Sequence, residues 1–275
     1  MKFYLLKFNI VGLDLTSLHF LINSVEKNNN KETVLSLGNP TIHFTRKALN
    51  KFLKMYSGEI KEFPQEVELN GKNLFKHLGY KSFLVLDINN DADVDIVWDL
   101  NYSDNLPDEY LNYFDLLIDP GTLQHVFDIR SCLDCIKKLT KIDGYIYHIS
   151  PGNNYIDHGF YQISPTLFQD YYYENQFKLV SLSLQADKRI SELIPYKENI
   201  YRNKKLQNIF RNNKKVKVHQ IVQKKINSEN KIPIQHFYST NKTKRNPSRE
   251  YIHNVTLKES RFKKIAKKFY LSILK

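Results

Sequence analysis

The feature that most constrains the fold is an alternation, from residue 33 to residue 222, of short apolar runs with segments of helical periodicity. The runs hold many Val, Ile and Leu residues and few polar ones, which is typical of strands covered on both faces. They predict strands at residues 33–37, 82–86, 94–98, 114–118, 145–149, 179–184 and 216–222. This alternation indicates an α/β fold, a Rossmann-like seven-stranded and mostly parallel sheet with helices on both faces.

Helical stripes separate these strands. Apolar residues recur at three- and four-residue steps from Phe44 to Tyr56 and again from Ile129 to Leu139. Ser164 and Pro165 supply an N-cap and a first-turn proline to a third, aromatic-rich helix. A dinucleotide-binding fold is the rival interpretation, but no G-x-G-x-x-G motif follows the first strand.

The net charge of +12 is unevenly distributed. Residues 1–186 carry 17 Lys and Arg against 23 Asp and Glu, whereas residues 187–275 carry 24 against 6. A mildly acidic body therefore precedes a strongly basic C-terminal third. We predict an N-terminal helical segment at 1–30, a Rossmann-like domain at 31–226, and a basic linker with an amphipathic helix at 227–275.

Several classes of protein are excluded by composition. Cys132 and Cys135 are too few for a disulfide framework or a structural zinc site, and the histidines are too scattered to suggest a metal centre. The apolar N-terminus is broken by Lys7, Asn9 and Asp14, unlike a signal peptide. No run approaches the ~20 apolar residues of a membrane span. These features predict a cytoplasmic protein without a metal.

Three strand ends carry residues suited to a nucleotide ligand, because ligands of parallel sheets lie beyond the carboxyl ends of the strands. Gly38 follows the first strand and lets a ligand approach the backbone. Asp87 ends the second strand, where a carboxylate can accept both hydroxyl groups of a ribose. Asp99, beside the backbone of Leu100, is placed to accept from the amino group of an adenine.

The fourth and fifth strands run into polar segments. A turn at 119–121, with Asp119 and Gly121, is followed by His125 at the start of a helix, and we predict that this turn borders the reacting part of the ligand. Polar side chains concentrated in a loop at this edge of a sheet are more often functional than elsewhere. The loop after the fifth strand holds Asn153, Asn154, His158 and Tyr161.

One long run carries a resemblance to a known family. Residues 87–165 resemble a bacterial family of class I S-adenosylmethionine-dependent methyltransferases, often associated with glycan or surface-polysaccharide biosynthesis, and the resemblance covers most of residues 30–226. Its most specific stretches are DLLIDPGTLQHVFD at 115–128 and HISPGNNYIDHGFYQISPTLF at 148–168. The resemblance implies S-adenosylmethionine as cofactor. It implies that Gly38 lines the cofactor, that Asp87 binds its ribose, that Asp99 and Leu100 hold its adenine, and that Asp119 and Gly121 border its methionine part.

The chain also departs from that family. Ser36 stands where many class I methyltransferases have an acid on the first strand, and Gly38 alone remains of their G-x-G-x-G loop. Residues 119–121 read Asp-Pro-Gly where the related pattern has Asp-Gly-Gly. The long segment between Gly38 and Asp87 predicts two connecting helices.

The predicted reaction is methyl transfer to a hydroxyl group of a sugar, glycan or other small-molecule acceptor. Alignment of donor and acceptor supplies much of the rate, and a base is needed because a sugar hydroxyl is a poor nucleophile. His125 and His158 are the candidate bases, since histidine titrates near neutrality, and Asn153, Asn154 and Tyr161 are candidate acceptor ligands.

Two other functions stay open. The basic third suits an RNA methyltransferase, although no RRM or KH signature and no aromatic interleaving accompany it. A cofactor-binding module without activity is the other. At the C-terminus, Phe262, Ile265, Phe269 and Ile273 share one helical face flanked by Lys and Arg. That helix is expected either to contact an anionic membrane surface or to dock on the acidic body.

Overall fold

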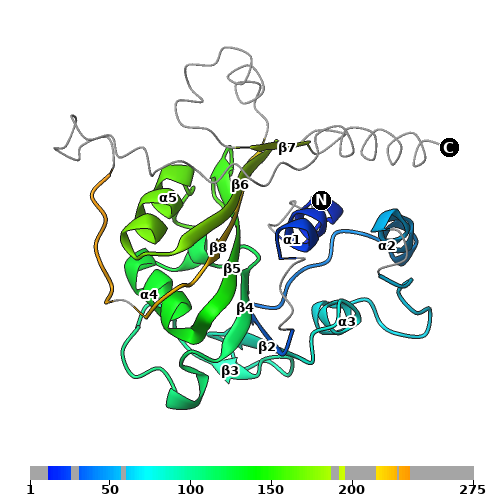
Figure 1. Ribbon diagram of the computed structural model, residues 1–275, viewed down its shortest axis with the longest axis horizontal. Coiled ribbons are helices and arrows are strands. Elements are labelled where there is room, and N and C mark those ends of the chain that lie inside the picture. Colours follow the sequence, from blue (N-terminus) through cyan, green and yellow to red (C-terminus); the bar gives the residue numbers. More distant parts are fainter. Residues whose placement is uncertain are drawn as a thin grey trace, which may run out of the picture.

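The computed structural model describes residues 12–25, 31–56, 60–186, 192–195, 215–227 and 229–235. An eight-stranded sheet in the order β3-β2-β1-β4-β5-β8-β6-β7 forms its centre (Figure 1). The strands are β1 (Thr33–Leu37), β2 (Ser82–Asp87), β3 (Ile96–Val97), β4 (Phe114–Asp119), β5 (Thr140–Asn153), β6 (Lys178–Ala186), β7 (Glu192–Pro195) and β8 (Val216–Gln223).

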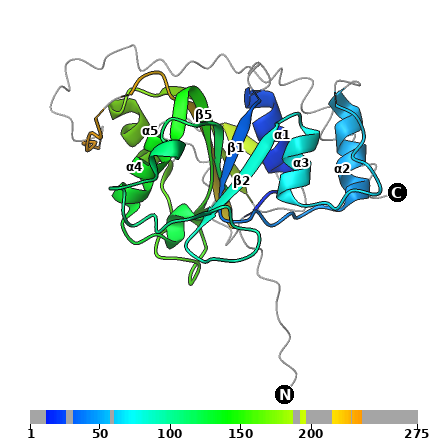
Figure 2. The ribbon, with the colours of Figure 1, turned by 90° about the horizontal axis from the view of Figure 1, so that it is seen from below.

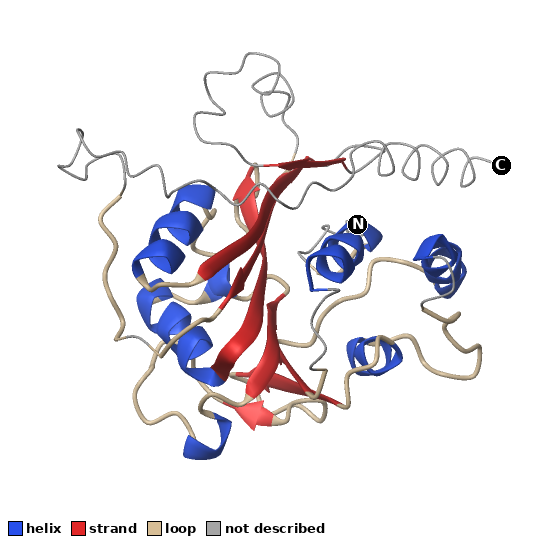
Figure 3. Ribbon diagram, in the orientation of Figure 1, coloured by secondary structure: helices blue, strands red, loops and turns tan. Residues whose placement is uncertain are grey.

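The described ranges also contain five α-helices and three 3-10 helices (Figure 3). The α-helices are α1 (Leu15–Val25), α2 (Arg46–Leu53), α3 (Gly71–His77), α4 (Ile129–Leu139) and α5 (Pro165–Glu174). The 3-10 helices are η1 (Lys54–Tyr56), η2 (Asp108–Tyr110) and η3 (Leu123–His125). Helices α2 and α3 fill the segment between Gly38 and Asp87, as predicted.

The direction of winding reverses at β1. This strand pairs in parallel with β2 on one side and with β4 on the other, and β3 and β5 extend the sheet outward in parallel. The chain therefore leaves β1 toward one side of the sheet and leaves β4 toward the other. The point between these two strands is a topological switch point, where ligands of open α/β sheets bind at the carboxyl ends of the strands. The predicted Rossmann-like, mostly parallel sheet is confirmed.

The far half of the sheet is antiparallel. Strand β8 is the last of the described strands in the sequence, but it lies between β5 and β6 and is antiparallel to both. Strand β7 pairs antiparallel with β6. The prediction of seven strands was wrong by one, because the four-residue β7 is too short to produce a periodic signal. Strand β3 is shorter than predicted, since residues 96 and 97 alone pair with β2.

Two apolar layers enclose the sheet (Figure 2). Helices α4 and α5 pack on one face against residues such as Leu35 and Leu37, and α1, α2 and α3 pack on the other against residues such as Val34. All five residues of β1 are buried, which accounts for the absence of charged side chains from this strand. The segment predicted as an N-terminal unit includes α1, whose Leu18 and Phe20 belong to the second layer.

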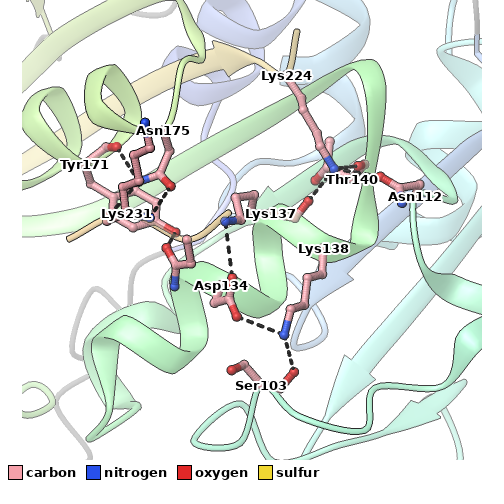
Figure 4. A network of polar contacts seen from close by, with 11 residues as sticks. Ser103, Asn112, Asp134, Lys137, Lys138, Thr140, Tyr171, Asn175, Lys224 and Lys231 are labelled. Atoms are coloured by element: carbon pink, nitrogen blue, oxygen red, sulfur yellow. Dashed lines mark hydrogen bonds and ion pairs between the residues drawn. The ribbon is translucent and has the colours of Figure 1, made fainter. Parts of the chain in front are cut away.

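The C-terminal end of α4 is held by a lysine from beyond β8. Lys224 is 2% exposed, and its Nζ donates to the carbonyls of Lys137 and Thr140 at 2.8 Å and to Asn112 Oδ1 at 2.7 Å (Figure 4). The last carbonyls of a helix have no partner within it, so this ammonium group caps α4. Burial and the nearby Lys137 lower the pKa of Lys224 to about 8.

The end of the described chain runs along α5. Tyr171 donates its hydroxyl to Asn230, and the side chain of Asn175 pairs with both backbone groups of Lys231. None of the described helices combines the length and apolar character needed to cross a bilayer. The predicted amphipathic helix, and with it the expected membrane contact, lies outside the described residues.

Candidate active site

The ends of β1, β2 and β4 meet at Gly38. This glycine has φ +73°, in the left-handed region that side chains disfavour, and its N–H donates to the Leu86 carbonyl at 2.7 Å. A Cβ added here would lie 3.2 Å from Thr122 Oγ1 and 3.6 Å from Asp87 Oδ2. The structure therefore keeps a bare stretch of backbone between a carboxylate and a hydroxyl at the switch point.

Two hydroxyl groups fix this turn. Ser36 is fully buried and donates to the Gly38 carbonyl at 2.6 Å, so the residue at the expected acid position closes the glycine turn. Thr122 donates to the Leu37 carbonyl at 2.5 Å and joins the ends of β1 and β4. The sequence analysis did not assign Thr122 to the site. Its position directly after the 119–121 turn is the feature that could have indicated this role.

Asp87 keeps part of its carboxylate open. Its Oδ1 accepts from the N–H of Asn89 at 3.1 Å, while Oδ2 points to the space beside Gly38. Within the described ranges no cation forms an ion pair with it. A half-buried carboxylate of this kind can accept hydroxyl groups from a ribose.

The segment after β3 lies beside Asp87. The backbone N–H of Trp98 donates to the Asp87 carbonyl at 2.9 Å. Asp99 Oδ1 accepts from the backbone and side chain of Asn101, and Asn101 Oδ1 accepts from the N–H of Asp128 at 2.9 Å. Asp99 thus orders this loop against the start of α4. The Leu100 side chain is buried in the core.

The turn after β4 is organised by Asp119, which is fully buried. Its Oδ1 accepts the backbone N–H groups of Gly121, Thr122 and Leu123 at 3.2, 2.7 and 3.2 Å. Gly121 has φ +111°. The carboxylate is thus occupied inside the protein, where it holds the turn through three successive N–H groups.

The loop after β5 packs on η3. Phe160 and Tyr161 donate their N–H groups to the carbonyl of Gln124 at 2.8 and 3.3 Å. Gly159 has φ +80°, and a Cβ there would lie 2.7 Å from the same carbonyl, so only glycine fits this contact. The two most specific stretches of the family resemblance therefore meet in space.

This contact brings the two predicted histidines together. The rings of His125 and His158 lie 5.1 Å apart, centroid to centroid, at 78°. His125 is exposed, while His158 is half-buried, and its buried Nε2 has no hydrogen-bond partner among the residues that the structure describes. Burial, His125 and Lys215 lower the pKa of His158. This lowered pKa favours the neutral imidazole.

Aromatic side chains flank the histidines. Phe127 and Phe160 are 70% and 66% exposed, and their rings pack edge to face with centroids 5.6 Å apart. Tyr161 supports this pair by donating its hydroxyl to the Phe127 carbonyl at 2.7 Å. Exposed apolar patches beside polar loops mark binding surfaces.

The remaining predicted acceptor residues lie at the exit of β5. Asn153 is exposed and pairs with Val216 of β8, and Asn154 follows with φ +59°. In the described part of the chain, no group of three or more His, Cys, Asp or Glu residues is arranged to hold a metal ion.

Comparisons with known proteins found similarity to solved structures only. No protein-family model and no curated protein matches the sequence. A solved S-adenosylmethionine-dependent methyltransferase from Archaeoglobus fulgidus is 16% identical, with a TM-score of 0.44 over 77% of this chain and 95% of that one. The 1,6-didemethyltoxoflavin-N1-methyltransferase of Burkholderia thailandensis, solved with S-adenosylhomocysteine, is 11% identical, with a TM-score of 0.43 over 77% of each chain.

Proposed function

We propose that this protein is an S-adenosylmethionine-dependent methyltransferase that methylates a hydroxyl group of a small-molecule acceptor. The observation that carries the proposal is the bare Gly38 backbone between the Asp87 carboxylate and the Thr122 hydroxyl, at the switch point of the sheet. A sugar or glycan is the acceptor class that the sequence resemblance suggests.

The residues at this point suit the cofactor. A side chain at Gly38 would fill the space that a ligand needs beside the backbone, and Asp87 Oδ2 is available for ribose hydroxyl groups. Asp99 and the Leu100 backbone continue along the same edge toward an adenine, and the Gly121 turn borders the opposite end. S-adenosylmethionine supplies an electrophilic methyl group on its sulfonium.

The acceptor side consists of the loop after β5 and η3. His158 is the residue of this loop that would take the proton of the acceptor hydroxyl, and the bound cofactor would supply the methyl group. His125 lies against the same imidazole. The exposed rings of Phe127 and Phe160 suit the C–H face of a sugar, and Asn153 and Asn154 suit its other hydroxyl groups.

Calorimetric titration of the full chain with S-adenosylhomocysteine tests the donor side. We expect saturable one-to-one binding, and we expect no binding of NAD, the ligand of the rival fold. No heat with S-adenosylhomocysteine at millimolar concentration contradicts the proposal and leaves a module without activity as the better interpretation.

A second assay tests the acceptor. The formation of S-adenosylhomocysteine is followed with methyl glycosides and, in parallel, with a short RNA. Turnover on the glycosides supports the proposal, whereas turnover on RNA alone supports the RNA methyltransferase instead.

A further inference from the structure

Three buried polar side chains form a bridge behind the turn at Asp119. His148 on β5 is the register partner of Asp119 on β4, and its Nδ1 lies 2.8 Å from Asp119 Oδ2. Its Nε2 lies 2.6 Å from the hydroxyl of Tyr172 on α5. Asp119 and His148 are 0% exposed and Tyr172 is 2% exposed. These three residues are called the buried bridge below.

One arrangement of protons satisfies every group in the buried bridge. A carboxylate is an acceptor only, so His148 donates from Nδ1 to Asp119. The other nitrogen of a neutral imidazole is an acceptor, so Tyr172 donates its hydroxyl to Nε2. Burial raises the pKa of Tyr172 well above its ordinary value, which keeps this hydroxyl a donor.

Apolar packing alone does not require such a bridge. His148 stacks on Phe168 of the apolar layer, with ring centroids 4.5 Å apart. Buried polar groups are costly unless they are satisfied, and satisfied networks rigidify the segment they hold. The segment at the end of the buried bridge is the turn, because Asp119 Oδ1 accepts three successive N–H groups of residues 121–123.

The same turn carries Thr122, whose hydroxyl bonds the end of β1 beside Gly38. We infer that His148 and Tyr172 are positioning residues: through Asp119 they fix the 121–123 turn, and with it the cofactor side of the site. This inference rests on the proposed function for the ligand, whereas the order of the turn is measurable without any ligand.

Two neighbouring tyrosines provide a matched pair of variants. Tyr172→Phe removes the hydroxyl that ends the buried bridge. Tyr171→Phe removes the hydroxyl of another buried tyrosine on the same helix, one that bonds Asn230 instead. Both are compared with wild type by amide hydrogen exchange and by titration with S-adenosylhomocysteine, at a temperature where thermal melts show all three folded.

We expect the amides of Gly121, Thr122 and Leu123 to exchange about tenfold faster in Tyr172→Phe, with affinity for S-adenosylhomocysteine about tenfold weaker. Tyr171→Phe should leave both quantities at wild-type values. Unchanged exchange and affinity in Tyr172→Phe overturn the inference. Equal changes in both variants also overturn it, because they indicate general loosening of α5.

Substitutions of His148 provide a rescue test. His148→Asn places an amide donor near the position of Nδ1, whereas His148→Leu leaves Asp119 Oδ2 without a partner. Asn should therefore retain more protection of the 121–123 amides than Leu, and the reverse order contradicts the inference. If the Leu variant does not fold, the tyrosine pair decides. If wild type binds no S-adenosylhomocysteine, the proposed function fails, and amide exchange alone decides the role of the buried bridge.

Discussion

Asp87 and Asp119 each end a parallel strand, but burial gives them different roles. Asp87 is half-buried and has one open oxygen, whereas Asp119 is fully buried and accepts four hydrogen bonds. Their sequence contexts are alike, so both were predicted to face the ligand. The distinguishing partner, His148, comes from the next strand through sheet register, which sequence spacing does not reveal.

Asp87→Asn tests the open carboxylate. The amide keeps an oxygen for the N–H of Asn89, so we expect an unchanged thermal midpoint. Loss of a charge-assisted hydrogen bond costs about 1.5–3 kcal/mol, so affinity for S-adenosylhomocysteine should fall roughly ten- to a hundredfold. Asp91→Asn, an exposed neighbour, is the control for titration calorimetry. Equal affinities for the two variants would show that Asp87 does not touch the ligand.

His158→Ala tests the proposed base. His158 lies in the acceptor loop, so the rate at which an acceptor substrate is methylated should fall about 10²- to 10⁴-fold. Affinity for S-adenosylhomocysteine should stay within error of wild type. His77→Ala, on α3 away from the site, provides the control for both measurements. A collapse of cofactor affinity instead would place the loop after β5 on the donor side.

At the scale of elements, residue periodicity predicts the position of a strand but not its ends, because the ends depend on pairing with other strands. The strand at 33–37 matches β1 because its burial is continuous. Strand β5 runs from Thr140 to Asn153, well beyond the predicted 145–149, because it pairs with β8 as far as Asn153. Strand β7 exists through its pairing with β6. Such extensions depend on partners that are distant in sequence.

Lys224→Met tests the cap on α4. Methionine keeps the apolar stem but removes the donor for the Lys137 and Thr140 carbonyls and for Asn112. Unsatisfied buried acceptors cost about 1–3 kcal/mol, so the free energy of unfolding in urea should fall by about that amount. Lys225→Met removes an exposed lysine that pairs with Asp143 and should change it by less than about 1 kcal/mol. Equal losses would show that the cap contributes nothing specific.

At the scale of the whole molecule, buried neutral histidines make stability depend on acidity. Burial lowers the pKa of His219 to about 3 and that of His19 to about 4, from 6.5. For Asp14, burial acts to raise the pKa, but Lys217, His219 and hydrogen bonds outweigh it and lower the value to about 2, from 3.8. In all three cases the unfolded state binds protons at a higher pH than the folded state does.

The thermal midpoint should therefore be level between pH 6.5 and about 8, where Lys224 begins to titrate, and should fall as the pH decreases from 6.5 toward 3. Each histidine costs up to roughly 1.4 kcal/mol per pH unit in this window, and Asp14 adds to the fall between pH 3.8 and 2. His219→Gln, which removes one of these titrations, should flatten the profile. A wild-type profile that stays level from pH 7 to 4 would contradict the prediction.

The place of β8 also sets an order of events during synthesis. The strand emerges from the ribosome after β5 and β6, yet it is the only link between them in the sheet. Until residues 216–223 are available, β5 and β6 each present an open edge, the kind of surface that pairs with other chains. The nascent domain is thus most exposed to aggregation before β8 is synthesised, and Lys224, which caps α4, follows directly after β8.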